Sequence, residues 1–165
     1  MTYLPPAVVA APPAALPPVP STAARIHAVA EALQPDLAQG FQIDALRLRL
    51  EMERAFGGSD ATGAWDWKLA YEAGEVALVF FLRKFGRALL ARAGSPAALL
   101  PILAKLAGLL PTHTRRSEEM ERFQQFSTPL PMGLAALAAA QITPRDRVLE
   151  PSAGTGLLAI LAEIA

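Results

Sequence analysis

Apolar side chains between residues 21 and 110 recur mostly at helical spacing. Ser21 is suited to cap a helix over residues 22–34, because a serine side chain accepts hydrogen bonds from the first N–H groups of a helix. Pro35 is expected to end this helix, since proline supplies no N–H to continue it. A further helix is predicted between Ser95 and Leu110. This part of the chain therefore predicts helices with no sheet.

Residues 43–56 carry an ambiguous pattern. The stretch ALRLRLEMER alternates apolar and charged side chains, which taken alone predicts a strand. Its residue types are helix formers, however, and no β-branched residue follows Ile43 in this segment. Several apolar residues also share one helical face: Ala45, Leu48, Met52, Ala55 and Phe56. We therefore expect a helix here.

The longest predicted helix runs from about Ala64 to Ala93. One apolar stripe follows its length, formed by Trp67, Ala70, Tyr71, Gly74, Leu78, Phe81, Phe85 and Leu89. Its solvent side is expected to carry the charged residues Lys68, Glu72, Glu75, Arg83 and Arg87. Acidic residues come early and basic residues late, as the helix dipole favours. Packing in the core, rather than stacking on nucleic-acid bases, is the favoured interpretation of Trp65 and Trp67.

The pattern changes at Pro129. LPMGLAALAAAQ predicts a helix of small residues, ITPRD a turn, RVLE a short strand, PSAGTG a loop, and LLAILAEIA the start of another helix. Helix, strand, glycine loop and helix in this order begin an α/β unit. The predicted fold class is therefore mainly α, with a helical domain over residues 21–122 followed by the truncated start of an α/β domain over residues 123–165. A short helix is also expected near residues 118–123.

Composition limits the classes of partner and site. The formal net charge is zero, so nucleic-acid binding requires a local basic patch; the candidates are Arg115 and Arg116, and the basic residues late in the long helix. There is no cysteine, which fits a reducing cytoplasm. Residues 1–20 hold seven prolines and no charged side chain, which predicts a disordered or extended arm. We expect no membrane span. We also expect no metal site at His27 or His113.

The loop PSAGTG has the properties of a ligand site. Gly154 and Gly156 let a ligand approach the backbone closely, and the helix that follows directs its first N–H groups at the same point. Glu150 places a carboxylate at the end of the predicted strand, where it suits a cationic amine or a hydroxyl and opposes phosphate. No lysine follows the loop, and Ser152 stands where a dinucleotide fingerprint has its first glycine. The residues favour a ligand that is partly apolar and partly cationic.

The stretch VLEPSAGTG resembles motif I of class I S-adenosylmethionine-dependent methyltransferases, in the form found in enzymes that methylate adenine N6 in DNA. QQFSTP, which precedes it, is similar to their motif X. Motif X directly before motif I is the order of the γ class of these enzymes, whose catalytic domain is Rossmann-like. This resemblance covers Phe123 to Ala165, roughly a quarter of the chain. Residues 55–86 also resemble the helical region of methyltransferase–helicase fusions that carry a strawberry notch-like helicase.

The resemblance implies a role for particular residues in binding S-adenosylmethionine. Glu150 would meet the methionine amino group, while the backbones of Ala153, Gly154 and Gly156 would pass under the methionine and ribose. The motif X residues would close the methionine side of the pocket; these are Phe126, Thr128 and Pro129.

The family's catalytic motif, Asn or Asp followed by Pro-Pro and an aromatic residue, does not occur in this part of the sequence. The resemblance therefore implies an N-terminal fragment of a DNA methyltransferase, itself inactive and unable to bind S-adenosylmethionine tightly. Two alternatives stay open. In the first, the helical region is a DNA- or protein-binding module beside a vestigial methyltransferase region. In the second, the parent enzyme methylates RNA or protein.

Overall fold

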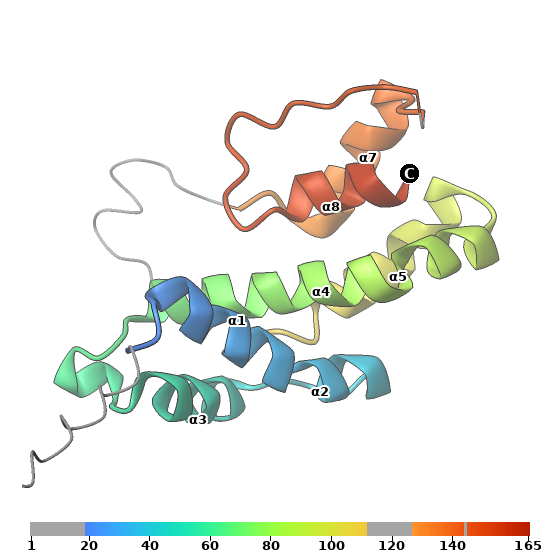
Figure 1. The fold of residues 1–165 in the computed structure, drawn as a ribbon. Coiled ribbons are helices and arrows are strands. Elements are labelled where there is room, and N and C mark those ends of the chain that lie inside the picture. Colours follow the sequence, from blue (N-terminus) through green and yellow to red (C-terminus); the bar gives the residue numbers. More distant parts are fainter. Residues whose placement is uncertain (1–18, 112–126, 144) are drawn as a thin grey trace, which may run out of the picture.

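The computed structural model describes residues 19–111, 127–143 and 145–165, and these form helices joined by loops (Figure 1). The elements are α1 (Thr22–Ala32), α2 (Gln34–Gln39), α3 (Ala45–Phe56), the 3-10 helix η1 (Asp60–Thr62), α4 (Trp67–Ala93), α5 (Pro96–Ala107), α7 (Leu130–Ala140) and α8 (Leu157–Ile164). The mainly helical class is therefore confirmed. Residues 1–18, the short helix expected near residues 118–123, and Arg115 and Arg116 lie outside the described residues.

Short polar side chains fix the start of the longer helices. Ser21 accepts a hydrogen bond from the N–H of Ala24, as predicted. Asp44, Asp66 and Ser95 do the same at the starts of α3, α4 and α5. Each of these caps satisfies a donor that has no partner inside its helix, so the chain enters each helix at a defined residue.

The segment 45–56 is a helix, as its residue types predicted, and the strand-like alternation has a simple origin. Leu48 and Met52 are completely buried, whereas Leu46 and Leu50 on the same helix are 63% and 49% exposed. The apolar residues at alternating positions thus point to different faces of α3, and only one face packs into the core. Residue type was the better guide here because the alternation includes leucines that the core does not use.

Pro35 acts differently from the sequence-based expectation. The first helix ends at Ala32, two residues before the predicted end, and Pro35 lies in the first turn of a second short helix, α2. Proline is accepted there because the first N–H groups of a helix need no partner within it. Gly40, with a φ of 72°, ends α2 in the left-handed conformation that glycine adopts without strain.

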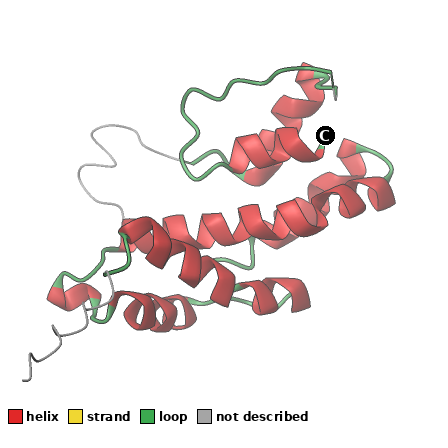
Figure 2. Cartoon of the chain, in the orientation of Figure 1, coloured by secondary structure: helices red, strands yellow, loops and turns green. Residues whose placement is uncertain are grey.

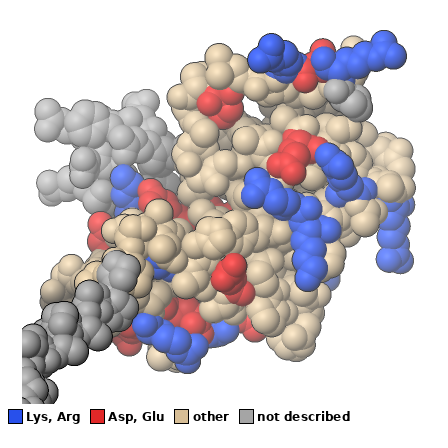
Figure 3. All heavy atoms as spheres, in the orientation of Figure 1, with Lys and Arg blue, Asp and Glu red and all other residues tan. Residues whose placement is uncertain are grey.

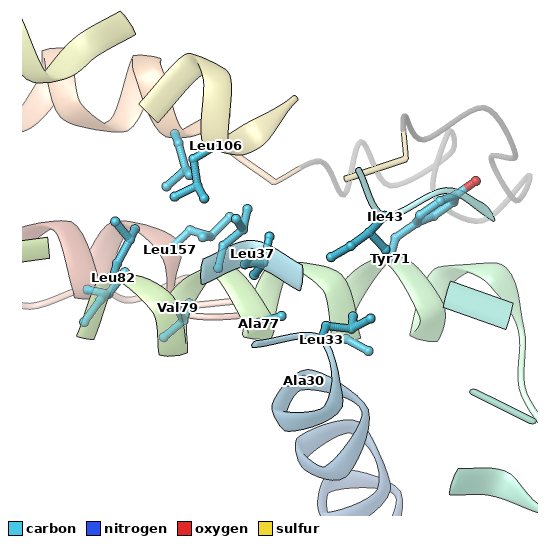
Figure 4. Packing of buried hydrophobic residues seen from close by; sticks show 14 of the residues in the cluster. Ala30, Leu33, Leu37, Ile43, Tyr71, Ala77, Val79, Leu82, Leu106 and Leu157 are labelled. Carbon is cyan, nitrogen blue, oxygen red and sulfur yellow. The ribbon is translucent and has the colours of Figure 1, made fainter. Parts of the chain in front are cut away.

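Helix α4 lies at the centre of the molecule, with α1, α2 and α3 on one side and α7 and α8 on the other (Figure 1). Buried side chains from α1, α2, α4, α5 and α8 belong to one hydrophobic cluster, part of which is seen in Figure 4. The predicted stripe is confirmed at Tyr71 and Leu78, whereas Phe81 and Phe85 are only half-buried. Packing on two sides also buries Glu75, which was wrongly expected to face solvent.

Two glycines allow α8 to approach its neighbours closely. A Cβ atom added to Gly86 of α4 would lie 2.8 Å from Cδ1 of Ile164, and one added to Gly133 of α7 would lie 2.8 Å from Cδ1 of Leu161. Both distances are shorter than real Cβ atoms show to their neighbours. The close packing of α8 on α4 and α7 therefore requires glycine, which has no Cβ atom, at both positions. The region predicted to begin an α/β domain therefore shares its core with the helical region.

The strand predicted at RVLE is not formed within the described residues. Residues 146–150 are a loop between α7 and α8 (Figure 2), and Val148 and Leu149 are 52% and 86% exposed. A strand is held by hydrogen bonds to a neighbouring strand, and the described part of the chain contains no strand that could pair with this segment. The turn before this loop is fixed by Asp146, which accepts hydrogen bonds from the N–H and hydroxyl of Thr143. These hydrogen bonds lower the pKa of Asp146.

Candidate functional site

The loop between residues 151 and 156 depends on two glycines for its course. Gly154 has a φ of 51° and Gly156 a φ of 91°, both in the left-handed region where a side chain introduces strain. Gly156 is also the N-cap of α8, and the structure shows no side chain that caps this helix. The first turn of α8 therefore follows directly from the glycine loop, and its N–H groups face the same end of the helix as the loop.

A cleft of about 760 Å³ lies in front of this loop. Its walls come from α1, α4, residues 127–128, the loop itself and the first turn of α8, which are distant in the sequence. The lining residues are Ala23, Ile26, His27, Lys68, Tyr71, Glu72, Glu75, Val76, Ser127, Thr128, Ser152, Ala153, Gly154, Thr155, Leu157 and Leu158. A volume of this size is typical of small-molecule sites.

Glu75 joins two walls of the cleft. Its side chain lies on α4 and the residue is only 5% exposed. The same carboxylate oxygen, Oε2, accepts a hydrogen bond of 2.7 Å from the Ser127 hydroxyl and one of 2.8 Å from the Thr155 hydroxyl. The helical region thus contacts both segments that resemble methyltransferase motifs. The sequence carried one signal for the burial of Glu75, since seven apolar residues follow it directly, from Val76 to Leu82, but no signal for its two partners.

A second carboxylate on α4 lies near Glu75. Burial raises the pKa of Glu72, with smaller contributions in the same direction from the charges of Glu75 and Asp66, while Lys68 opposes them. Glu72 and Glu75 make this wall of the cleft acidic, and Lys68 and His27 are the basic residues that line it. The wall therefore favours the cationic part of a ligand over a phosphate.

Replacing Glu72 with glutamine is expected to raise the melting temperature at neutral pH. Because the pKa of Glu72 is raised in the folded protein, the stability linked to its protonation is present below the unfolded pKa near 4.5 and is lost as pH rises through the folded pKa. Glutamine carries no charge at any of these pH values. Thermal denaturation at about pH 7 and about pH 4 should show the gain only at the higher pH; an equal gain at both would contradict this account of Glu72.

The structure places the predicted site residues in different ways. Thr128, Ala153 and Gly154 line the cleft. Pro129 and Gly156 lie beside it as the N-caps of α7 and α8. The carboxylate of Glu150 accepts a hydrogen bond of 2.9 Å from the N–H of Ser152, so it shapes the turn and is not among the residues that line the cleft. Phe126 lies outside the described residues.

The residues around the cleft combine several kinds of contact. Backbone groups of the glycine loop, the hydroxyls of Ser127 and Thr155, and the acidic wall are polar, whereas Ile26, Val76 and Leu157 are apolar. Such a site suits a ligand with a flat or apolar part and a cationic part. Within the described residues, no group of His, Asp and Glu side chains is arranged to hold a metal ion.

The two tryptophans and two basic side chains of α4, Arg83 and Arg87, have structural partners. The indole N–H of Trp65 donates to the carbonyl of Gly58, and that of Trp67 donates to Asp60, which supports their predicted packing role. Arg83 pairs with Glu163, and Arg87 donates to the carbonyl of the same residue. The face shown in Figure 3 carries its basic side chains in separate groups with acidic ones between them. This face therefore presents no continuous basic stripe for a nucleic acid.

Across the ranges that the structure covers, no helix is long and apolar enough to cross a bilayer. Comparison of the chain with models of protein families, with curated proteins and with solved structures gives no match.

Proposed function

We propose that the cleft is part of a binding site for S-adenosylmethionine, and that the chain is an N-terminal part of a DNA methyltransferase that acts on adenine N6. One observation carries this proposal. Ser127 and Thr128, from the segment that resembles motif X, line the same cleft as Ser152 to Thr155, from the segment that resembles motif I. The resemblance requires both segments to meet one cofactor, and in the structure both are held by Glu75.

The chemistry of the walls fits this cofactor. S-adenosylmethionine carries a cationic amino group, a sulfonium centre and a flat adenine, and it supplies the methyl group in the reaction. In the proposed arrangement the glycine loop passes under the methionine and ribose, and the apolar residues Ile26 and Val76 contact the less polar parts. The acidic wall on α4 faces the cationic centres, while Glu150 acts by shaping the turn before the loop.

The exposed segment 146–150 supports the proposal that further strands complete the site. Val148 and Leu149 are apolar and lie in a loop, whereas in a Rossmann-like sheet such a segment is a strand covered on both faces. The remaining parts of the proposed enzyme would then belong to other segments of the full-length protein, including a helicase. They would take the target adenine out of the duplex and hold its amino group in line with the methyl group. A DNA substrate and the lack of cysteine agree with a cytoplasmic location.

Calorimetry of the 165-residue chain with S-adenosylmethionine tests the proposal. We expect weak but measurable binding, with a dissociation constant of about 1–10 mM, equivalent to about −4 to −3 kcal/mol, because in this proposal other segments of the full-length protein complete the site. Gly154→Val should abolish this weak binding, since it strains the loop at a positive φ. ATP is the control ligand, and it should bind more weakly because its phosphates oppose the acidic wall.

Two outcomes would contradict the proposal. Micromolar binding to this chain would show that the site is complete, and ATP binding as well as S-adenosylmethionine would show that the cleft does not select a cationic cofactor. If binding is instead weak and selective for S-adenosylmethionine, methylation assays of the full-length protein on DNA, RNA and protein would identify the substrate class.

A further inference from the structure

We propose that Glu75 is a positioning residue, which fixes the glycine loop against residues 127–128 and so makes the helical region one wall of the ligand site. The loop lies 80 residues after Glu75 and the other segment 52 residues after it. A helical module that was independent of the cleft would contribute no such link. The effect of Glu75 on cofactor binding rests on the proposed function, whereas its effect on the loop does not.

The geometry of the two hydrogen bonds supports this role. Both hydroxyls donate to the same oxygen, at 2.7 and 2.8 Å, so the carboxylate holds Ser127 and Thr155 at a fixed separation. Glu75 itself is the ninth residue of the 27-residue helix α4, between the buried residues Gly74 and Ala77. The anchor is therefore part of the rigid core, while the two segments that it holds are loops.

Burial of a carboxylate is costly unless hydrogen bonds or charges offset the loss of water. The other buried carboxylate among the described residues, Glu51, forms ion pairs with Arg47 and Arg54 and does not line the cleft. Glu75 differs because two of its hydrogen-bond donors belong to the walls of the cleft. Hydrogen bonds to a charged acceptor are stronger than those between neutral groups, which suits an anchor for two loops.

Hydrogen exchange of the ligand-free chain tests the positioning role directly. In Glu75→Ala the hydrogen-bonded backbone amides of Ser152 and Gly156 should exchange about tenfold faster, because both hydrogen bonds that hold the two loops to Glu75 are lost. In Glu75→Gln the change should stay within about threefold, since the amide oxygen of glutamine still accepts from the hydroxyls. Lys84→Ala is the control, because Lys84 is an exposed residue of the same helix that does not line the cleft, and it should leave exchange of the loop unchanged.

The double variant Ser127→Ala with Thr155→Val approaches the contact from the other side. It removes the two hydroxyl donors, leaves α4 intact, and should accelerate loop exchange as Glu75→Ala does. This variant keeps the test valid if Glu75→Ala fails to fold, which circular dichroism would reveal. Unchanged loop exchange in the folded double variant would overturn the proposal, as would equal acceleration in Lys84→Ala.

Cofactor binding separates this inference from the proposed function. If the loop is held by Glu75, Glu75→Ala should also weaken S-adenosylmethionine binding, by the factor by which the fraction of chains with a closed loop falls. Faster exchange without cofactor binding in any variant, including the original chain, would support the positioning role and contradict the methyltransferase proposal. Loss of binding with unchanged exchange would contradict the positioning role alone.

Discussion

Leu48→Ala is expected to destabilise the protein by about 2–5 kcal/mol, because it removes a completely buried side chain and leaves a cavity. The matched control is Leu50→Ala, two positions further along α3, where the leucine is 49% exposed and the loss should be below about 1 kcal/mol. For a chain of this length the first change corresponds to a fall in melting temperature of roughly 5–15 °C.

Thermal denaturation of the two variants checks this contrast. On a strand, residues two positions apart point to the same face, so the two leucines would be buried or exposed together. On a helix they diverge, as they do here. Similar losses for both variants would therefore contradict the helical packing of α3.

Gly86→Val is expected to cost about 1–3 kcal/mol, because its side chain must enter the contact between α4 and Ile164 of α8. Its Cβ atom would lie 2.8 Å from Cδ1 and 3.0 Å from Cγ2 of Ile164, so a rotation of one terminal methyl group would not relieve the overlap. Ala88→Val, two positions further on, is the control, because Ala88 is exposed and a larger side chain there meets solvent.

Chemical denaturation measures the two free energies of unfolding. Helix α8 also supplies Leu157 and Leu158 to the cleft, so Gly86→Val should disturb the cleft as well as lower the stability. Equal stability of Gly86→Val and Ala88→Val would show that α8 does not pack on α4 as closely as the structure has it.

The sequence was a good guide to the helices because their signals are local. The side chain of Ser21, for example, accepts from the N–H of Ala24, three residues away, and such a contact is the same whatever surrounds the helix. The position of Pro35 was misread because one proline is compatible with both the end of one helix and the first turn of the next.

Burial of Glu75 was not predictable from periodicity. A single helix shows only that one of its faces is apolar, whereas α4 is covered by α1 on one side and α8 on the other. The partners of Glu75 lie 52 and 80 residues further along the chain, and no spacing within α4 reveals them. The acidic wall of the cleft was missed for the same reason.

The strand expected at RVLE was predicted from the sequence but is not formed in the structure. Its residue types and its place before the glycine loop fit a strand, but a strand exists only through pairing with another. The glycine loop depends less on such partners. Gly154 and Gly156 take left-handed conformations although the described residues form no sheet beside them, because the turn into α8 already requires these conformations.

The central claim is that the cleft binds S-adenosylmethionine. A nuclear magnetic resonance titration of the 165-residue chain with this ligand tests the claim most directly. At ligand concentrations of several millimolar, matched to the expected weak affinity, the amide signals of Thr128, Gly154 and Val76 should shift together. These residues belong to three separate walls, and ATP at the same concentration should leave them in place.

A second cavity, of about 490 Å³, lies between α5, α7, α8 and the end of α4, and it serves as an internal control. Its residues Leu99, Leu134 and Leu161 should show no response to S-adenosylmethionine. Concerted shifts of the first three amides alone are the result that the account predicts. Shifts confined to the second cavity, or no shift anywhere at these concentrations, would contradict it.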